Sequence, residues 1–313
     1  MLLRAIFSRE GRLAMNHKMT IKRLVIYLVL AFSLVWFPTI LFAMNGGEYE
    51  SGTMNFILTV SMLCPGLAMI ITRYATKEGY SVNGKGFLQL GIDLKNKKWM
   101  WYLVAIILPI VYMDLGVELL YLIFPQCFNP EMLKVHEVTQ DTLWMYPVVG
   151  ITSTVMVSFG ALGEELGWRG YMIPKLEELF GTKKAIIIGG IIWGIWHFPA
   201  NCIGHNFGTD YWGEPWSGFL VFTVFTVFVG ALLVLVTKKT GSIWPATFLH
   251  AVNNSGANAL SAYYDREQLT GIWQEPVVSS MIQFVPVIIL GTCAIIILCR
   301  DKEKTLVEQN ELC

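Results

Sequence analysis

The sequence predicts an all-α membrane protein with eight transmembrane helices and both termini in the cytoplasm. Three observations lead to this prediction: the composition, the recurrence of long apolar runs, and the placement of Lys and Arg between those runs. Of 313 residues, 54% are hydrophobic and only 15% are charged. A soluble domain spends about a quarter of its residues on charge, so this chain has too few polar side chains to cover its own surface.

Eight apolar runs are each long enough to cross a hydrocarbon core of about 30 Å as a helix. They lie at residues 22–44, 54–75, 99–124, 143–168, 185–203, 216–237, 242–262 and 276–299. Basic residues precede the first run, as in a signal peptide, but the run exceeds the roughly 7–15 apolar residues of a signal sequence, so we interpret it as a helix. The chain shows no repeat and no soluble segment, and we expect residues 1–313 to form a single integral-membrane domain.

The basic residues fix the expected orientation. If the eight runs all span, 21 of the 23 Lys and Arg residues fall on one side, and only Lys134 and Arg266 fall on the other. Short cytoplasmic loops retain Lys and Arg, so this side should be cytoplasmic, and the plasma membrane is the expected location. The 23 basic residues balance 23 acidic ones, which gives no basis for a nucleic-acid partner.

Charged and polar side chains inside the runs are the candidates for function. A charge near the middle of a spanning helix costs about 2.5–3.5 kcal/mol, so each one needs a partner, a water-filled cavity or a function. Four groups meet this description: Glu164 and Glu165 with Arg169, His197 alone, His250 with Asn253 and Asn254, and Asp114 with Glu118.

Helical spacing places three of these groups at a common depth. In a hairpin that turns at Gly181, Glu164 lies 17 residues before the turn and His197 lies 16 residues after it. At about 1.5 Å per residue the two side chains have the same height. His250 lies about 13 Å along a helix that starts near Gly241, with Asn254 one turn further on the same face. We therefore expect these side chains to share one layer in the cytoplasmic half of the bilayer.

This set of residues suits hydrolysis of an amide by an activated water. A carboxylate in a poorly solvated site is a suitable general base, while imidazole and carboxamide groups can orient it or stabilise an oxyanion. No Ser or Cys in the layer has an obvious base beside it, which disfavours a covalent acyl-enzyme. Glu165 and Arg169 have the spacing of a helical ion pair, so we expect Arg169 to hold Glu165 and Glu164 to face the cavity.

Three motifs resemble those of the CPBP family of intramembrane proteases, also called the CAAX-protease and bacteriocin-processing (Abi) family. GEELGWRG at 163–170 resembles its EExxxR motif, WGIWH at 193–197 its FxxxH motif, and HAVNN at 250–254 its HxxxN motif. The departure is Trp193, where the family has Phe. The resemblance covers about 143–262, which would be the catalytic core.

The resemblance implies an eight-helix membrane endopeptidase. Glu164 would be the general base and His197 would accompany it, His250 and Asn254 would stabilise the oxyanion, and Glu165 with Arg169 would support the site. Eukaryotic members of the family cleave prenylated CAAX proteins, whereas bacterial relatives have other substrates, including leader peptides. The expected partners are thus a peptide or membrane-protein substrate and the lipid bilayer.

No cofactor is expected, because no HExxH helix is present, and we favour a metal-free glutamate mechanism. The alternative is a zinc ion held by Glu164, His197 and His250, since the family was long described as metalloproteases.

Two other functions stay open at this point. One is a non-catalytic scaffold or bacteriocin-immunity protein of the same family, in which the polar residues only join helices. The other is a proton- or cation-coupled transporter that uses Asp114 and Glu118, although no inverted halves are visible. Trp193 and Trp196 are expected to be packing residues, Trp168 to border the cavity, and His205 to face solvent in a loop.

Overall fold

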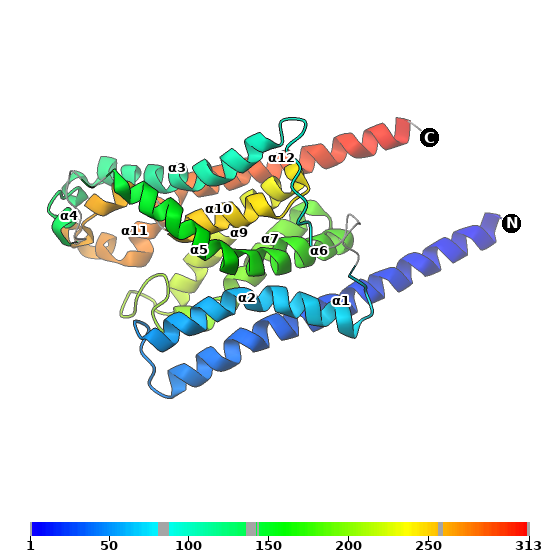
Figure 1. Cartoon of the computed structure of the whole chain (residues 1–313), viewed down its shortest axis with the longest axis horizontal. Coiled ribbons are helices and arrows are strands. Elements are labelled where there is room, and N and C mark those ends of the chain that lie inside the picture. Colours follow the sequence, from blue (N-terminus) through cyan, green and yellow to red (C-terminus); the bar gives the residue numbers. More distant parts are fainter. Residues whose placement is uncertain (1, 81–87, 136–141, 143, 256–258, 312–313) are drawn as a thin grey trace.

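Long helices that run side by side make up this chain in the computed structural model, which describes residues 2–80, 88–135, 142, 144–255 and 259–311 (Figure 1). The long helices are α1 (Leu2–Met44), α2 (Gly52–Ala75), α3 (Trp99–Ile123), α5 (Met145–Gly167), α7 (Thr182–Trp196), α9 (Trp216–Thr240), α10 (Trp244–Ser255) and α12 (Val285–Glu311). Shorter α-helices are α4 (Met132–Val135), α6 (Ile173–Phe180), α8 (Phe198–Asn201) and α11 (Pro276–Gln283). A π-helical turn, Trp168–Met172, joins α5 to α6.

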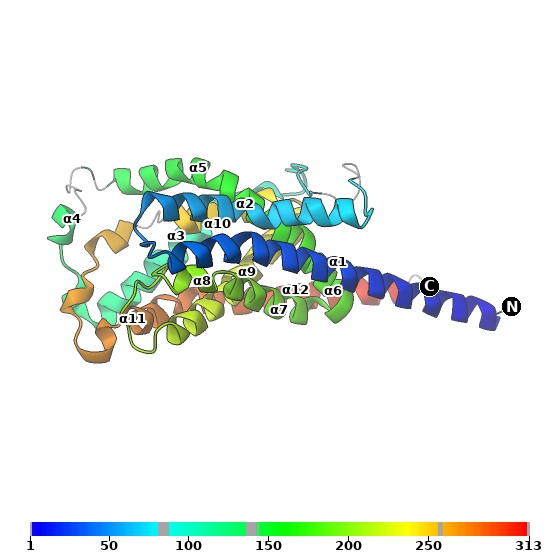
Figure 2. The same ribbon diagram turned by 90° about the horizontal axis from the view of Figure 1, so that it is seen from below.

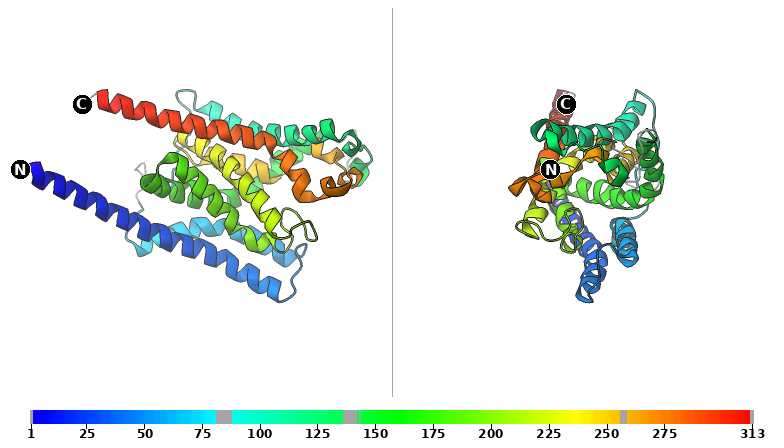
Figure 3. Two further views of the ribbon diagram at one scale, coloured as in Figure 1. Left: turned by 180° about the vertical axis from the view of Figure 1, so that it is seen from behind. Right: turned by 90° about the vertical axis from the view of Figure 1, so that its left-hand side faces the viewer.

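Both chain ends project from the same end of the bundle, as two views show (Figures 1 and 3). We call this the terminal end. The loops 45–51 and 202–215, together with α4 and α11, lie at the opposite end, which we call the loop end (Figure 1). α1 lies along α2 and extends beyond it at the terminal end (Figure 2).

The chain is an all-helical integral membrane protein in its described residues, but the prediction of eight spans is wrong. Four helices are long and apolar enough to cross a membrane, and a fifth span results if α11 and the part of α12 up to Asp301, bent by 48°, are counted together. The four are Asn16–Met44, Gly52–Ala75, Trp99–Ile123 and Trp216–Thr240. The runs expected at 143–168, 185–203 and 242–262 are absent from this set, and residues 143 and 256–258 lie outside the described part.

Helix length explains two of the three missing spans. α7 has 15 residues and α10 has 12. At 1.5 Å per residue they reach about 22 Å and 18 Å, less than the roughly 30 Å of a hydrocarbon core. α7 ends at Trp196 and α8 begins at Phe198, because Pro199 has no N–H to continue the hydrogen-bond ladder of α7 and is tolerated only in the first turn of a new helix. The third run, α5, carries the buried carboxylates Glu164 and Glu165 near its end.

The predicted hairpin between α6 and α7 is present. Gly181 ends α6 with a φ of 78°, a backbone conformation that glycine adopts without a steric penalty. α7 begins directly at Thr182. The helix before this turn is interrupted by the π-helical turn Trp168–Met172, a feature that occurs mostly as single turns within α-helices and frequently at functional sites.

Charged side chains at the terminal end fasten α6 to the first two helices. Glu78, just after α2, accepts hydrogen bonds from Lys175 Nζ at 2.7 Å and from Tyr171 Oη at 2.8 Å, and Arg23 Nε lies 3.6 Å away. Burial raises the pKa of Glu78, but the hydrogen bonds and charge of Lys175 outweigh this effect and hold that pKa below its ordinary value. Glu78 is therefore ionised and paired at neutral pH.

Glycines allow α5 to approach α2 closely. A Cβ atom at Gly167 would lie 2.5 Å from Pro65, and one at Gly163 would lie 2.7 Å from the backbone of Met62 and Leu63. Small residues four apart permit such contact between membrane helices, where packing rather than the hydrophobic effect drives association. These two glycines flank Glu164 and Glu165, so the close approach sets where the carboxylates lie.

We expect Gly167→Ala to lower the free energy of unfolding by about 1–3 kcal/mol, because the added methyl group meets the backbone of α2. Thermal unfolding of the detergent-purified protein measures this effect. Gly52→Ala is the matched control, since nothing lies within 4 Å of a Cβ atom there. Equal unfolding temperatures for the two variants would show that the helix contact is looser than described.

Candidate active site

Glu164 is a buried carboxylate held by two indoles. Its side chain, 2% exposed, accepts hydrogen bonds at Oε2 from Trp193 Nε1 at 2.8 Å and from Trp168 Nε1 at 3.2 Å. Its other oxygen, Oε1, lies 3.9 Å from His250 Nε2. This separation is too long for a direct hydrogen bond and suits a bridging water. One oxygen is thus fixed by neutral donors while the other faces an imidazole.

Glu165 connects Arg169 to His250. Glu165 Oε1 accepts hydrogen bonds from Arg169 Nη1 and from His250 Nδ1, each at 2.8 Å. The Arg169 guanidinium also lies over the Trp193 ring, 4.1 Å from its centroid. The predicted Glu165–Arg169 ion pair is therefore present, and its Glu165 carboxylate also binds His250. Because His250 Nδ1 donates to Glu165, its Nε2 is directed toward Glu164.

His197 ends α7 and is anchored to its own helix. Its Nδ1 donates to the carbonyl of Trp193 at 2.9 Å, which leaves Nε2 free of that contact. Trp193 therefore links His197 to Glu164, since its carbonyl accepts from one residue and its indole donates to the other. The His197 ring packs against Trp196 and Phe222, with centroids 4.7 and 4.9 Å apart.

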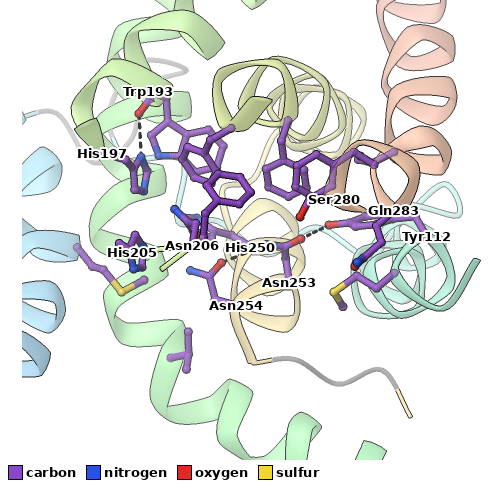
Figure 4. Close-up of a pocket in the computed structure, with 18 residues that line it drawn as sticks. Tyr112, Trp193, His197, His205, Asn206, His250, Asn253, Asn254, Ser280 and Gln283 are labelled. Atoms are coloured by element: carbon purple, nitrogen blue, oxygen red, sulfur yellow. Dashed lines mark hydrogen bonds between the residues drawn. The ribbon is translucent and has the colours of Figure 1, made fainter. Parts of the chain in front are cut away.

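A cavity of about 620 Å³ lies beside His197 and His250 (Figure 4). Its wall includes Trp193, His197 and His250, together with Asn253 and Asn254. Glu164 is not among the lining residues, so the prediction that it faces the cavity directly is corrected: Trp193 and His250 stand between it and the open space.

Asn254 lies on this wall with an exposed side chain. Its Oδ1 accepts from Asn253 Nδ2 at 3.2 Å, which leaves the Asn254 amide hydrogens available as donors. Asn253 in turn accepts a hydrogen bond from Tyr112 of α3. Tyr112 on α3 therefore holds Asn253, and through Asn253 it positions the neutral Asn254 amide at the cavity surface.

The sequence did not predict the positions of three side chains in the candidate site. Trp193 and Trp168 are carboxylate partners rather than packing or cavity residues, and their spacing gave a signal: Trp168 is one turn after Glu164, and Trp193 is one turn before His197. His205, expected to face solvent, is partly buried on the cavity wall. Its ring stacks on His197 at 6.2 Å with 6° between planes, and its Nδ1 shares a hydrogen bond of 2.8 Å with Tyr49 Oη. Burial lowers the pKa of His205 to about 4.

Asp114 and Glu118, the pair considered for transport, lie apart from this cavity wall. Asp114 Oδ1 accepts a hydrogen bond from the backbone N–H of Leu260 at 3.3 Å, and Glu118 is exposed on α3. Asp114 thus fixes the chain that follows α10, which is a structural use of its charge.

Donors suited to a metal ion do not converge in the described part of the chain. No three His, Cys, Asp or Glu side chains there are close enough to share one ion. The alternative zinc set of Glu164, His197 and His250 is not brought together as a ligand group.

Residues 145–256 match the family model described as "Type II CAAX prenyl endopeptidase Rce1-like". We call residues 145–256 the Rce1-like segment, after the family model that they resemble. It contains all three motifs, and the match confirms the resemblance to CAAX proteases that the motifs predicted.

A curated relative of the Rce1-like segment is CAAX prenyl protease 2 of Methanococcus maripaludis. The two chains are 29% identical over 120 residues, which is 37% of this chain and 44% of the relative. The match thus spans less than half the length of that relative. Within the Rce1-like segment lie Glu164, Glu165, Arg169, Trp193, His197, His250 and Asn254.

We expect Trp193→Phe to lower the free energy of unfolding by at least about 1.5 kcal/mol, because a hydrogen bond to a buried charged group is worth about 1.5–3 kcal/mol. Trp216→Phe is the control, since Trp216 is 62% exposed and packs on Phe198 only through its ring. Chemical denaturation in detergent measures both variants. A Trp193→Phe protein as stable as the control would mean that the indole does not support Glu164.

Proposed function

We propose that this chain is an integral-membrane endopeptidase in which Glu164 activates a water molecule for attack on a peptide bond. The proposal depends on one distance: Glu164 Oε1 lies 3.9 Å from His250 Nε2, beside the cavity. A carboxylate oxygen and an imidazole nitrogen at this separation can both contact one water molecule. The likeness of the segment 145–256 to CAAX prenyl endopeptidases supports the same reaction class.

In the proposed reaction Glu164 accepts a proton from water while the water oxygen forms a bond to the carbonyl carbon. The Asn254 amide donates a hydrogen bond to the resulting oxyanion, and the His250 ring beside it stabilises the same charge. The C–N bond then breaks, and Glu164 returns its proton to the leaving amine. His197 orients the peptide or the water through Nε2. Trp168 and Trp193 keep Glu164 in place throughout.

Glu165 and Arg169 support this reaction through His250. Removing one member of a buried ion pair leaves the other charge uncompensated, so both are needed for the imidazole to keep its orientation. Their proposed role is positional, since Glu165 contacts His250 and Arg169 but does not reach the cavity wall.

The proposed substrate is a peptide or a segment of a membrane protein. The relative is named CAAX prenyl protease 2, and we extend to this chain only the cleavage of a peptide bond near the membrane. We also propose that the chain resides in the plasma membrane with both termini in the cytoplasm, because the basic residues gather at the terminal end.

We expect Glu164→Gln to lower the rate of peptide cleavage by about 10²–10⁴-fold, the range that a general base supplies. The change is nearly isosteric, so the protein should still fold in the membrane. Comparison of membrane peptides from cells with the original or the altered chain measures the loss and also identifies substrates.

Glu118→Gln is the matched control because Glu118 is exposed and lies outside the cavity wall. Cleavage that survives Glu164→Gln would refute the assigned base. A cellular phenotype that persists without any cleavage would favour the scaffold or immunity role.

We propose that the reaction needs no metal ion, which is supported by the failure of His, Cys, Asp and Glu donors to converge in the described residues. Cleavage by purified protein should therefore continue after dialysis against a strong zinc chelator. Loss of activity on chelation, restored by added Zn²⁺, would contradict this mechanism.

A further inference from the structure

The active-site cavity lies toward the loop end of the bundle. Three of its lining residues, His205, Asn206 and Phe207, belong to the loop between α8 and α9. Ser280 and Gln283 come from α11, which is also at the loop end (Figures 1 and 4). The exposed side chain of Asn206 brings the cavity wall to the protein surface there.

Residue positions along α9 give the distance between the cavity and the terminal end. It begins at Trp216 at the loop end, and Phe222 on its second turn lines the cavity. Lys238 and Lys239 occupy its last turn, 16 and 17 residues after Phe222. At 1.5 Å per residue, Phe222 at the cavity lies about 24 Å along α9 from these lysines. This distance is most of the thickness of a hydrocarbon core.

The two ends differ in charge. The described loops at the loop end contain eight acidic residues and only two basic ones, Lys134 and Arg266. The acidic residues are Glu48, Glu50, Glu131, Asp210, Glu214, Asp265, Glu267 and Glu275. At the terminal end, by contrast, Lys and Arg residues form ion pairs that include Lys175–Glu78 and Lys238–Glu177. Retention of Lys and Arg in the cytoplasm therefore assigns the terminal end to the cytoplasm.

We infer that the cavity opens on the extracytoplasmic side, so that the enzyme cleaves peptide segments that have already been exported or that extend from the outer leaflet. This inference rests on the proposed function and adds the side from which the substrate arrives. The scissile bond approaches His250, which lies between the cavity and Glu164, from the loop end past His205 and not from the cytoplasm.

The chemistry of the wall limits what can enter. Its polar members are His, Asn, Gln, Ser and Tyr, and its apolar members include Phe222, Phe225 and Met113. Among the described residues that line the cavity, none carries a carboxylate, an ammonium or a guanidinium group. A charged side chain buried there would lack an ionic partner, so the substrate segment is an apolar or neutral stretch of peptide.

Cysteine labelling in intact cells tests the inference. Single cysteines replace Ser280 in the cavity wall, Thr209 in the exposed loop, and Lys183 at the start of α7, in a chain whose Cys202, Cys293, Cys299 and Cys313 are changed to serine. A membrane-impermeant maleimide should label Ser280→Cys and Thr209→Cys before permeabilisation, and Lys183→Cys only afterwards. The reverse pattern would overturn the inference whether or not Glu164→Gln abolishes cleavage.

Labelling also tests the route of the substrate. Saturating Ser280→Cys with the impermeant reagent in intact cells should abolish cleavage of an exported peptide, because the adduct fills the cavity. The same treatment of Thr209→Cys should leave cleavage unchanged, because Thr209 lies in the loop but not on the cavity wall. Full cleavage by labelled Ser280→Cys would show that the peptide does not pass this wall.

Discussion

Burial of two carboxylates and one guanidinium inside an apolar bundle constrains the whole centre of this protein. Glu164, Glu165 and Arg169 are each no more than 4% exposed. Charges out of water are tolerated only when every one has close partners, so the surrounding helices must supply them. α7 supplies the Trp193 indole and α10 supplies His250. The contacts that make burial of these charges tolerable also orient the groups that we propose to be catalytic.

This constraint explains why close helix packing and site geometry are inseparable here. Gly163 and Gly167 let α5 lie directly against α2, and Glu164 and Glu165 lie between these two glycines. The π-helical turn that follows carries Trp168 and Arg169, one partner for each carboxylate. A small shift of α5 would therefore disturb both hydrogen-bond networks at once.

The cavity adds a different kind of constraint. Its volume is about 620 Å³, and its wall combines neutral polar groups with phenylalanine rings. His205 from the loop stacks on His197 from the helix, so the loop end contributes directly to the surroundings of the site. The outward-facing opening that we infer connects these features, because the proposed neutral peptide would enter from the acidic loop end and approach the proposed base, Glu164.

The sequence alone determined the residue types of the site and every relation within one helix. The spacing of Glu165 and Arg169 predicted their ion pair, and Gly181 predicted the hairpin, because both depend on local backbone geometry. Hydropathy overestimated the spans, since it does not register that α7 stops at His197. Only the tertiary structure decided that His250 contacts Glu165, 85 residues away, and that Trp193 rather than open space meets Glu164. Such contacts depend on the rotation and depth at which helices pack, which no periodicity along one segment encodes.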